Sequence, residues 1–378
     1  MAGGAERLGG WSDRRRTRKP RQDQPGGPGR GVGIVDVARR AGVSPATVSR
    51  ALRGLPNVSR ETRTKVLSAA DELGYAASPL ASALATGRMR SIGVVLPYAG
   101  RWFFAEVVRG IEASLRTHGY DLVLHVLADD RRRHEFFASL PVRRRVDALL
   151  LVALDVDPGE VAVLRGLGIP LAWVGEPVAG GHGELIDDAE AARVAVRHLV
   201  ELGHRRIASI GGDLSGSRPS GPGVRRTGGY RSVLTQARLA VRPEWIRDGG
   251  FSPEGGYRAA HDLLTSGEPP TALFCQSDEM AFGAMAAVRD LGLGCPRDVS
   301  VVGVDGHELA GTLDLTTVAQ PVYDLGAQAA RWLVGRLAAG DDEDEEDDRA
   351  PADVADHDAH HVHPVRLLVR GSTGPAAA

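Results

Sequence analysis

Residues 32–75 constrain the fold of this chain most strongly, because apolar helical repeats alternate there with residues that end and start helices. Four apolar residues recur at the i, i+3, i+4 and i+7 spacing of one helix face: Ile34, Val37, Ala38 and Ala41. Gly42 allows the tight backbone turn of a helix exit. Ser44 followed by Pro45 then predicts the start of a second helix. The segment therefore predicts two short helices joined by a turn.

A third helix is expected to support the first two. The second helix has a short apolar inner face: Val48, Ala51 and Leu52. Ser59 predicts the cap of the third helix, which Gly74 closes. The apolar face expected for this third helix is Val66, Leu67, Ala70 and Leu73. The pattern predicts a helix-turn-helix, whose second helix lies in the DNA major groove. Helix spacing alone leaves a generic three-helix bundle as the alternative.

Charge is distributed unevenly along the 378 residues. The first 90 residues hold 17 Lys+Arg against 7 Asp+Glu, whereas the remainder holds 29 against 41. A basic end on an acidic body suits a protein that binds phosphates with one end only. Residues 1–31 are rich in Gly, Pro and Arg, and we expect a disordered basic arm. This arm either adds nonspecific DNA affinity or is a solvated tail.

Several classes of protein are disfavoured by the sequence. Two cysteines, Cys275 and Cys295, form no disulfide framework and fit a reducing cytoplasm. The N-terminus has no apolar signal region, and no apolar run is long enough for a membrane span. No Ser-His-Asp set, metal motif or Walker loop with usable spacing is present, so we expect neither an enzyme nor a bound cofactor.

From Ser91 to Thr373 the pattern changes to an alternation of short apolar runs with amphipathic helical stretches. The apolar runs include SIGVVLP, DALLLVAL, RRIASIGG, ALFCQSD and VSVVGVD. Such an alternation predicts doubly wound parallel sheets covered by helices on both faces. The strands are too many for one small sheet, so we expect two α/β lobes. A ligand would bind at the carboxyl ends of the strands. Residues 374–378 are a tail.

Residues 340–361 interrupt this alternation. Eight consecutive acidic residues, Asp341 to Asp348, cannot pack in a core, so we expect a disordered insertion. Four histidines at its end are of a type that binds transition metals: His357, His360, His361 and His363. The sequence shows no fixed scaffold for them. We therefore interpret the segment as an acidic surface insertion and assign no metal site.

The amino-acid sequences of several segments resemble those of the lactose/galactose-repressor family of bacterial transcription regulators. The segments are VDVARRAGVSPATVSRALRG, NVSRETRTKVLSAADELGY, LASALATGR and SIGVVLP, and the resemblance runs from about Val32 to Thr373. It implies a DNA-binding domain at 32–77, a hinge helix and linker at 78–90, and an effector domain at 91–373 with a periplasmic-binding-protein type I-like fold. It also implies a homodimer, a palindromic operator in double-stranded DNA, and a small-molecule effector.

The resemblance extends to the residues that contact DNA. Pro45, Ala46 and Arg50 occupy the family's base-reading positions, and arginine can bind guanine O6 and N7 bidentately. Four polar residues are suited to phosphate oxygens, or else to capping and turn formation: Ser44, Thr47, Ser49 and Asn57. Ala81 and Leu84 belong to the hinge, where Leu84 is expected to wedge into the minor groove or, alternatively, to pack on a core. The hinge lacks an arginine that the family usually has there.

Effector contacts are carried over in part. Arg226, Asp278 and Asp305 match sugar-contact positions, with an interlobe salt bridge or, for Asp278, a helix cap as the alternative role. In the first lobe Tyr98 and Gly175 replace the family's acidic residues, and Ser277 replaces an asparagine beside Asp278. Three aromatic residues are stacking candidates: Phe103, Phe104 and Trp173. A carbohydrate is the expected effector. The competing functions are a transport-type solute receptor and an enzyme, and the N-terminal helical unit disfavours both.

Overall fold

The computed structural model describes residues 32–52, 55–75, 88–212, 221–343 and 360–376. The chain divides into two compact units, Met1–Ala81 and Ser82–Ala378. The two DNA-contact residues expected on the hinge, Ala81 and Leu84, and the basic arm lie outside the described residues. So does most of the acidic insertion. Each unit is described separately below.

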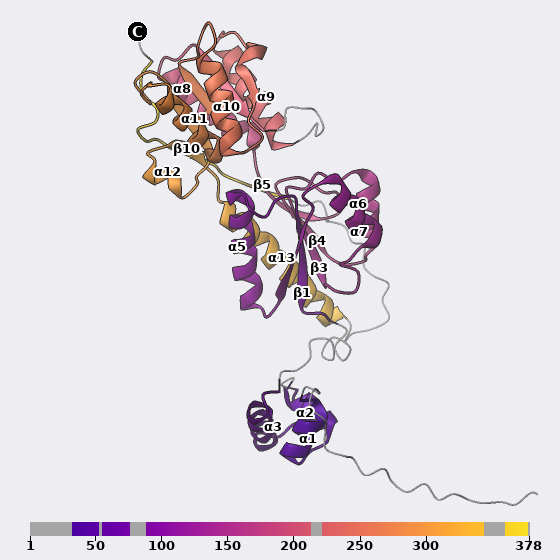
Figure 1. Ribbon diagram of the computed structural model, residues 1–378. Helices are drawn as coiled ribbons and strands as arrows, with labels where there is room; N and C mark the ends of the chain where they lie inside the picture. The colour runs from indigo at the N-terminus through magenta and orange to yellow at the C-terminus, as the bar shows by residue number, and fades with distance from the viewer. Residues whose placement is uncertain (1–31, 53–54, 76–87, 213–220, 344–359, 377–378) are drawn as a thin grey trace, which may run out of the picture. The chain divides into compact units, whose positions relative to one another are not determined.

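Within its described residues, the first unit has three helices around one small core (Figure 1). They are α1 (Ile34–Ala41), α2 (Pro45–Leu52) and α3 (Arg60–Glu72). Gly42 ends α1 in the left-handed conformation, with φ at 70°, and its N–H donates to the carbonyl of Ala38. Ser59 caps α3 by accepting a hydrogen bond from the Thr62 N–H at 3.2 Å. The predicted order of the helices is confirmed, and so are the predicted roles of Gly42 at the end of α1 and of Ser59 at the start of α3.

The predicted inner face of α3 needs one correction. Leu67 is 50% exposed, whereas Ala69 is buried with Val66 and Ala70. Starting from Val66, the positions that return to the same face of a helix are i+3 and i+4, which are Ala69 and Ala70. Leu67 is rotated by about 100° from Val66, so its side chain turns away from the core of the first unit.

The second unit contains two six-stranded sheets, one in each of two lobes. In the first lobe the order is β11-β5-β4-β3-β1-β2, and every pair is parallel. Its strands are β1 (Ser91–Leu96), β2 (Asp121–Val126), β3 (Ala148–Val152), β4 (Leu171–Val174), β5 (His182–Ile186) and β11 (His360–His363). Strand β11 lies at the end of the predicted insertion, which is therefore ordered at that end.

The sheet of the second lobe has the order β12-β10-β9-β8-β6-β7. Its strands are β6 (Ile207–Gly211), β7 (Ile246–Asp248), β8 (Ala272–Cys275), β9 (Ser300–Asp305), β10 (Thr316–Ala319) and β12 (Arg366–Leu368). The pairs are parallel except for β12, which runs antiparallel to β10. The expected doubly wound parallel sheets in two lobes are confirmed.

Helices cover both faces of each sheet, because the strands carry apolar side chains on both faces and these must be buried. In the first lobe one core includes α5 (Trp102–Thr117) and α13 (Val322–Glu343), and the other includes α6 (Asp130–Ser139) and α7 (Pro158–Arg165). In the second lobe α8 and α9 share one core, and α10 and α11 share the other. The remaining helices are α8 (Asp188–Glu201), α9 (Pro222–Gln236), η1 (Pro243–Trp245), α10 (Pro253–Leu264), α11 (Asp278–Asp290) and α12 (Leu309–Thr312).

Helix α13 belongs to the first lobe, although the chain reaches it only after five of the six strands of the second lobe (Figure 1). It packs closely on α5, and glycine makes this approach possible. A Cβ atom at Gly110 would collide with the backbone carbonyl of Tyr323, and one at Gly326 would collide with that of Val107. Helix α13 also extends to Glu343, so the first residues of the predicted insertion are helical rather than disordered.

Candidate functional site

The start of α2 presents the polar residues expected to contact DNA. Ser44 Oγ accepts a hydrogen bond from the Thr47 N–H at 3.1 Å and lies 2.9 Å from Thr47 Oγ1. Ser44 therefore caps α2, as expected from the Ser-Pro pair. Capping uses one acceptor position of the hydroxyl, and the side chain remains exposed.

The outer side of α2 is exposed while its inner side is buried. Ser44, Pro45, Ala46 and Arg50 are exposed, and Thr47 and Ser49 are half-buried. Val48 and Ala51 face the core. Asn57 is exposed between α2 and α3. All seven predicted contact residues that the structure describes are thus accessible to a ligand at this surface.

The second unit contains a cavity of about 380 Å³ with residues of both lobes in its wall. Of the predicted effector contacts, five line it: Tyr98, Phe103, Arg226, Ser277 and Asp305. Phe104 and Phe251 add further aromatic surface. Arg101 lies over the Tyr98 ring at 4.0 Å from its centre. The cavity therefore combines aromatic faces with buried charged groups, as small-molecule sites commonly do.

Arg226 is buried in the wall of the cavity, with its side chain 6% exposed. Its Nε donates to Asp188 Oδ1 at 2.9 Å, and its Nη1 donates to the carbonyl of Gln276. Asp305 Oδ1 lies 3.8 Å from the same Nη1. Arg226 therefore lines the cavity and forms salt bridges to two acidic residues of its own lobe.

Arg225 connects the two lobes across the cavity wall. Arg225 lies on α9 of the second lobe, and its side chain donates two hydrogen bonds to Asp188 Oδ2, at 2.8 and 3.0 Å. It also donates to both carboxylate oxygens of Glu176, which follows β4 of the first lobe, at 3.0 and 3.2 Å. Burial raises the pKa of Glu176, and its hydrogen bonds from Arg225 oppose that shift.

Asp305 ends strand β9 at the cavity with φ at 132°, a backbone conformation that is strained for a residue with a side chain. Its Oδ1 accepts a hydrogen bond from Gln320 Nε2 at 2.8 Å. Burial raises the pKa of Asp305 to about 6, and the opposing influences are Arg226 and Gln320. Strained backbone at a cavity wall is a frequent feature of ligand sites.

Asp278 and Trp173 are placed differently from the predictions. Asp278 does not line the cavity; its carboxylate accepts hydrogen bonds from Thr317 Oγ1 at 2.6 Å and the His307 N–H at 2.7 Å. The cap of α11 is Ser277 rather than Asp278. Trp173 lies in the core of the first lobe, where its Nε1 donates to the Gly181 carbonyl at 3.2 Å. Alternation along β4 turns its ring away from the cavity.

Three polar residues of the site were missed by sequence reasoning: Glu176, Asp188 and Arg225. Two of them adjoin a position that was considered, since Glu176 follows Gly175 and Arg225 precedes Arg226. The lost first-lobe acid is thus replaced one residue later. Asp188 is the first residue of α8, directly after the cap Asp187, and no sequence motif marked it.

Two comparisons with family models match the two units. Residues 33–78 match the model of bacterial regulatory proteins of the lacI family, and residues 196–373 match a periplasmic binding protein-like domain. A helix-turn-helix unit joined to a two-lobed unit with a polar cavity defines a class of DNA-binding regulatory proteins. No helix among the described residues has the length and apolar character needed to cross a bilayer.

Relatives and solved structures agree with this class. The HTH-type transcriptional repressor PurR of Pectobacterium carotovorum subsp. carotovorum (strain PC1) is 37% identical over 81% of this chain and 90% of its own. The Lac repressor dimer bound to operator and the anti-inducer ONPF has a TM-score of 0.76 and 27% identity, covering 91% of this chain and 100% of that chain. A complex of the transcriptional regulator CelR with cellobiose has a TM-score of 0.65 and 29% identity, with 90% and 99% covered.

The chain therefore belongs to the lacI family of bacterial regulatory proteins. Members of this family are DNA-binding transcription regulators rather than enzymes, and the PurR relative is named as a repressor. The earlier expectation of a DNA-binding transcription regulator is confirmed at this level.

Proposed function

We propose that this protein is a cytoplasmic homodimeric repressor that binds a palindromic operator and changes its DNA affinity when a carbohydrate binds between its lobes. The observation that carries the proposal is the Glu176–Arg225–Asp188 bridge, which joins the two lobes in the wall of the cavity. A ligand in contact with this bridge would favour one arrangement of the lobes. Ligands shift DNA affinity only through such a preference.

Operator recognition is assigned to the exposed side of α2. Arg50 reads a guanine, with Pro45 and Ala46 offering apolar contacts beside it. Ser44, Thr47, Ser49 and Asn57 bind phosphate oxygens and fix the position of α2 on the duplex. In the hinge, Ala81 and Leu84 approach the minor groove, where Leu84 unstacks the central base step. A symmetric dimer with two such DNA-binding units requires an operator that is an inverted repeat.

The chemistry of the cavity favours a polyhydroxylated ligand. Arg225, Arg226 and Asp305 supply charged donors and acceptors that can bind several hydroxyls at once. Tyr98, Phe103 and Phe251 supply ring faces for the apolar side of a sugar. The CelR relative was solved with cellobiose, which is consistent with this choice of ligand class. The cavity volume lies within the range typical of small-molecule sites.

A footprint of the full-length protein on the gene's own upstream DNA tests the first half of this proposal. We expect two protected half-sites related by a two-fold axis. A single asymmetric half-site would contradict the dimeric reader. Arg50→Ala serves as the specificity variant, and Arg60→Ala, on the exposed start of α3, serves as a matched control for loss of charge.

A titration with a panel of mono- and disaccharides tests the second half. A sugar that binds should change operator affinity by about tenfold or more, within the usual range of allosteric coupling. Saturation with a bound sugar at unchanged operator affinity would refute the switch. Failure of every sugar to bind, together with normal operator binding, would refute the ligand class while leaving the repressor assignment intact.

A further inference from the structure

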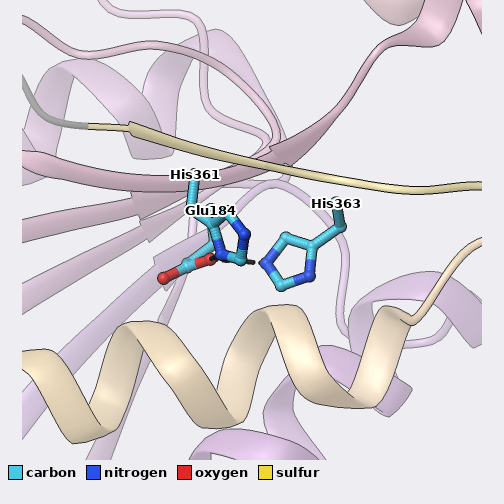
Figure 2. A group of neighbouring side chains, drawn as sticks. All are labelled: Glu184, His361 and His363. Carbon is cyan, nitrogen blue, oxygen red and sulfur yellow. Dashed lines mark hydrogen bonds and ion pairs between the residues drawn. The ribbon is translucent and has the colours of Figure 1, made fainter.

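Three polar side chains from two strands meet on the first lobe, outside the effector cavity. They are Glu184 on β5 and His361 and His363 on β11 (Figure 2). One ligand atom from each lies within 4.8 Å of the others. We propose that they form a site for a divalent transition-metal ion, with zinc as the natural test ion.

The strand register explains why these residues converge. Strand β11 pairs with β5 in parallel, and His361 stands opposite Glu184. Side chains two residues apart share a face of a strand, so His363 follows His361 on the same side of the sheet. Figure 2 shows the three side chains pointing toward one another on that side. The scaffold that could not be recognised from the sequence is thus provided by a strand pair.

The donor set suits a borderline ion such as zinc, which binds imidazole nitrogen and carboxylate oxygen. His363 Nε2 lies 2.5 Å and His361 Nδ1 lies 3.4 Å from Glu184 Oε2. Ligand atoms around a tetrahedral zinc ion stand about 3.4 Å apart at its usual bond lengths. Small side-chain rotations would therefore bring all three atoms to ligating distance. His361 is 57% exposed, so water can occupy a fourth position.

The environment of Glu184 supports this assignment independently. Its side chain is 4% exposed, and the ion pairs found for it in the described part of the chain are all to histidines. A buried carboxylate is costly unless a cation or hydrogen bonds compensate it. His182 Nε2 bonds to Glu184 Oε1 at 2.9 Å and stacks on Trp332 of α13. His182 thereby orients Glu184, as outer partners of metal ligands commonly do.

An ion at this site would link the edge strand β11 to its neighbour β5. Strand β11 is the last strand of the sheet and pairs only with β5 in the described order. The last residue of β5, Ile186, lines the cavity. Metal binding is therefore expected to stabilise the first lobe next to the cavity.

The test uses the full chain, purified without a histidine tag and stripped of metal. Zn²⁺ is titrated calorimetrically, and the visible spectrum of Co²⁺ reports the geometry of the ligands. We expect one equivalent of Zn²⁺ to bind and to raise the temperature of thermal unfolding. His361→Ala and Glu184→Gln should each weaken binding by about tenfold or more and remove most of the thermal shift.

His360→Ala is the matched control, because His360 is the adjacent histidine on the same strand but points to the opposite face, toward Trp173. It should bind Zn²⁺ as the wild type does. His361 is exposed, so its variant is expected to fold. The proposal is overturned if the wild type binds no Zn²⁺, or if affinity is equal in wild type and His361→Ala. Equal losses in His360→Ala and His361→Ala would also overturn it.

Discussion

Replacing Arg226 by methionine should destabilise the second unit strongly, whereas the same replacement of the adjacent Arg225 should have a smaller effect. Arg226 is 6% exposed and pairs with Asp188, which is equally buried. Breaking a buried ion pair by removing one partner costs about 3 to 5 kcal/mol. Asp188 keeps its two hydrogen bonds from Arg225, so we expect about 3 kcal/mol for Arg226→Met.

Arg225 is 29% exposed, so solvent screens its charge more than that of Arg226. Its loss frees Glu176, whose pKa is already raised by burial, so that carboxyl can take up a proton instead of remaining as a buried charge. We therefore expect about 1 to 2 kcal/mol for Arg225→Met, the usual range for hydrogen bonds that involve a charge.

Urea unfolding followed by tryptophan fluorescence measures this difference. Four tryptophans lie in the second unit, Trp102, Trp173, Trp245 and Trp332, so the signal reports mainly on that unit. Both substitutions replace arginine by methionine on the same helix and remove one positive charge. Each variant therefore controls for the change of residue type in the other. An equal loss in the two variants, or a loss below about 1 kcal/mol for Arg226→Met, would refute the reasoning from burial.

Three other predictions follow from single positions. Arg50→Ala should reduce discrimination at one base pair of each half-site by about 1 to 3 kcal/mol, measured with operator variants in a binding assay; unchanged discrimination would exclude Arg50 as a base reader. Because burial raises the pKa of Asp305 to about 6 from 3.8, the wild type should lose stability relative to Asp305→Asn as the pH rises from about 4 to about 6. Paired urea titrations check this, and a wild type that loses stability relative to Asp305→Asn as the pH falls would contradict the prediction. Val66→Ala should destabilise the first unit by about 2 kcal/mol, whereas Leu67→Ala should change it by less than about 0.5 kcal/mol, as measured by circular dichroism of the helices. Equal effects would contradict the corrected face of α3.

The fold was largely predictable because its signals are local. The α1–turn–α2 segment is predicted by Gly42, Ser44 and the spacing of its apolar residues. The apolar strands β1, β3 and β9 differ clearly in pattern from the amphipathic helices. Strands β5, β7, β10 and β11 were missed. Each is only three to five residues long, and none carries a run of apolar residues that distinguishes it from a loop.

The site was predictable only in part, because contacts across the fold have no local signature. Arg226 and Asp305 were found through a motif, whereas the partners that hold them, Asp188 of α8 and Gln320 after β10, were not. Trp173 was misplaced because an aromatic residue on a buried strand can face either side, and only register decides which. His361 and His363 acquired a scaffold only when β11 paired with β5, about 175 residues away in the chain.

The position of α13 makes the first lobe depend on the last part of the chain to be synthesised. Its core joins Ile111 of α5 with Leu325 and Leu333 of α13, so one face of the sheet stays uncovered until residues beyond 320 leave the ribosome. The two lobes consequently cannot mature one after the other in the order of translation. A nascent chain halted after β10 would leave the apolar side of α5 uncovered, and it would also lack β12 of the second lobe, so neither lobe would be complete at that point.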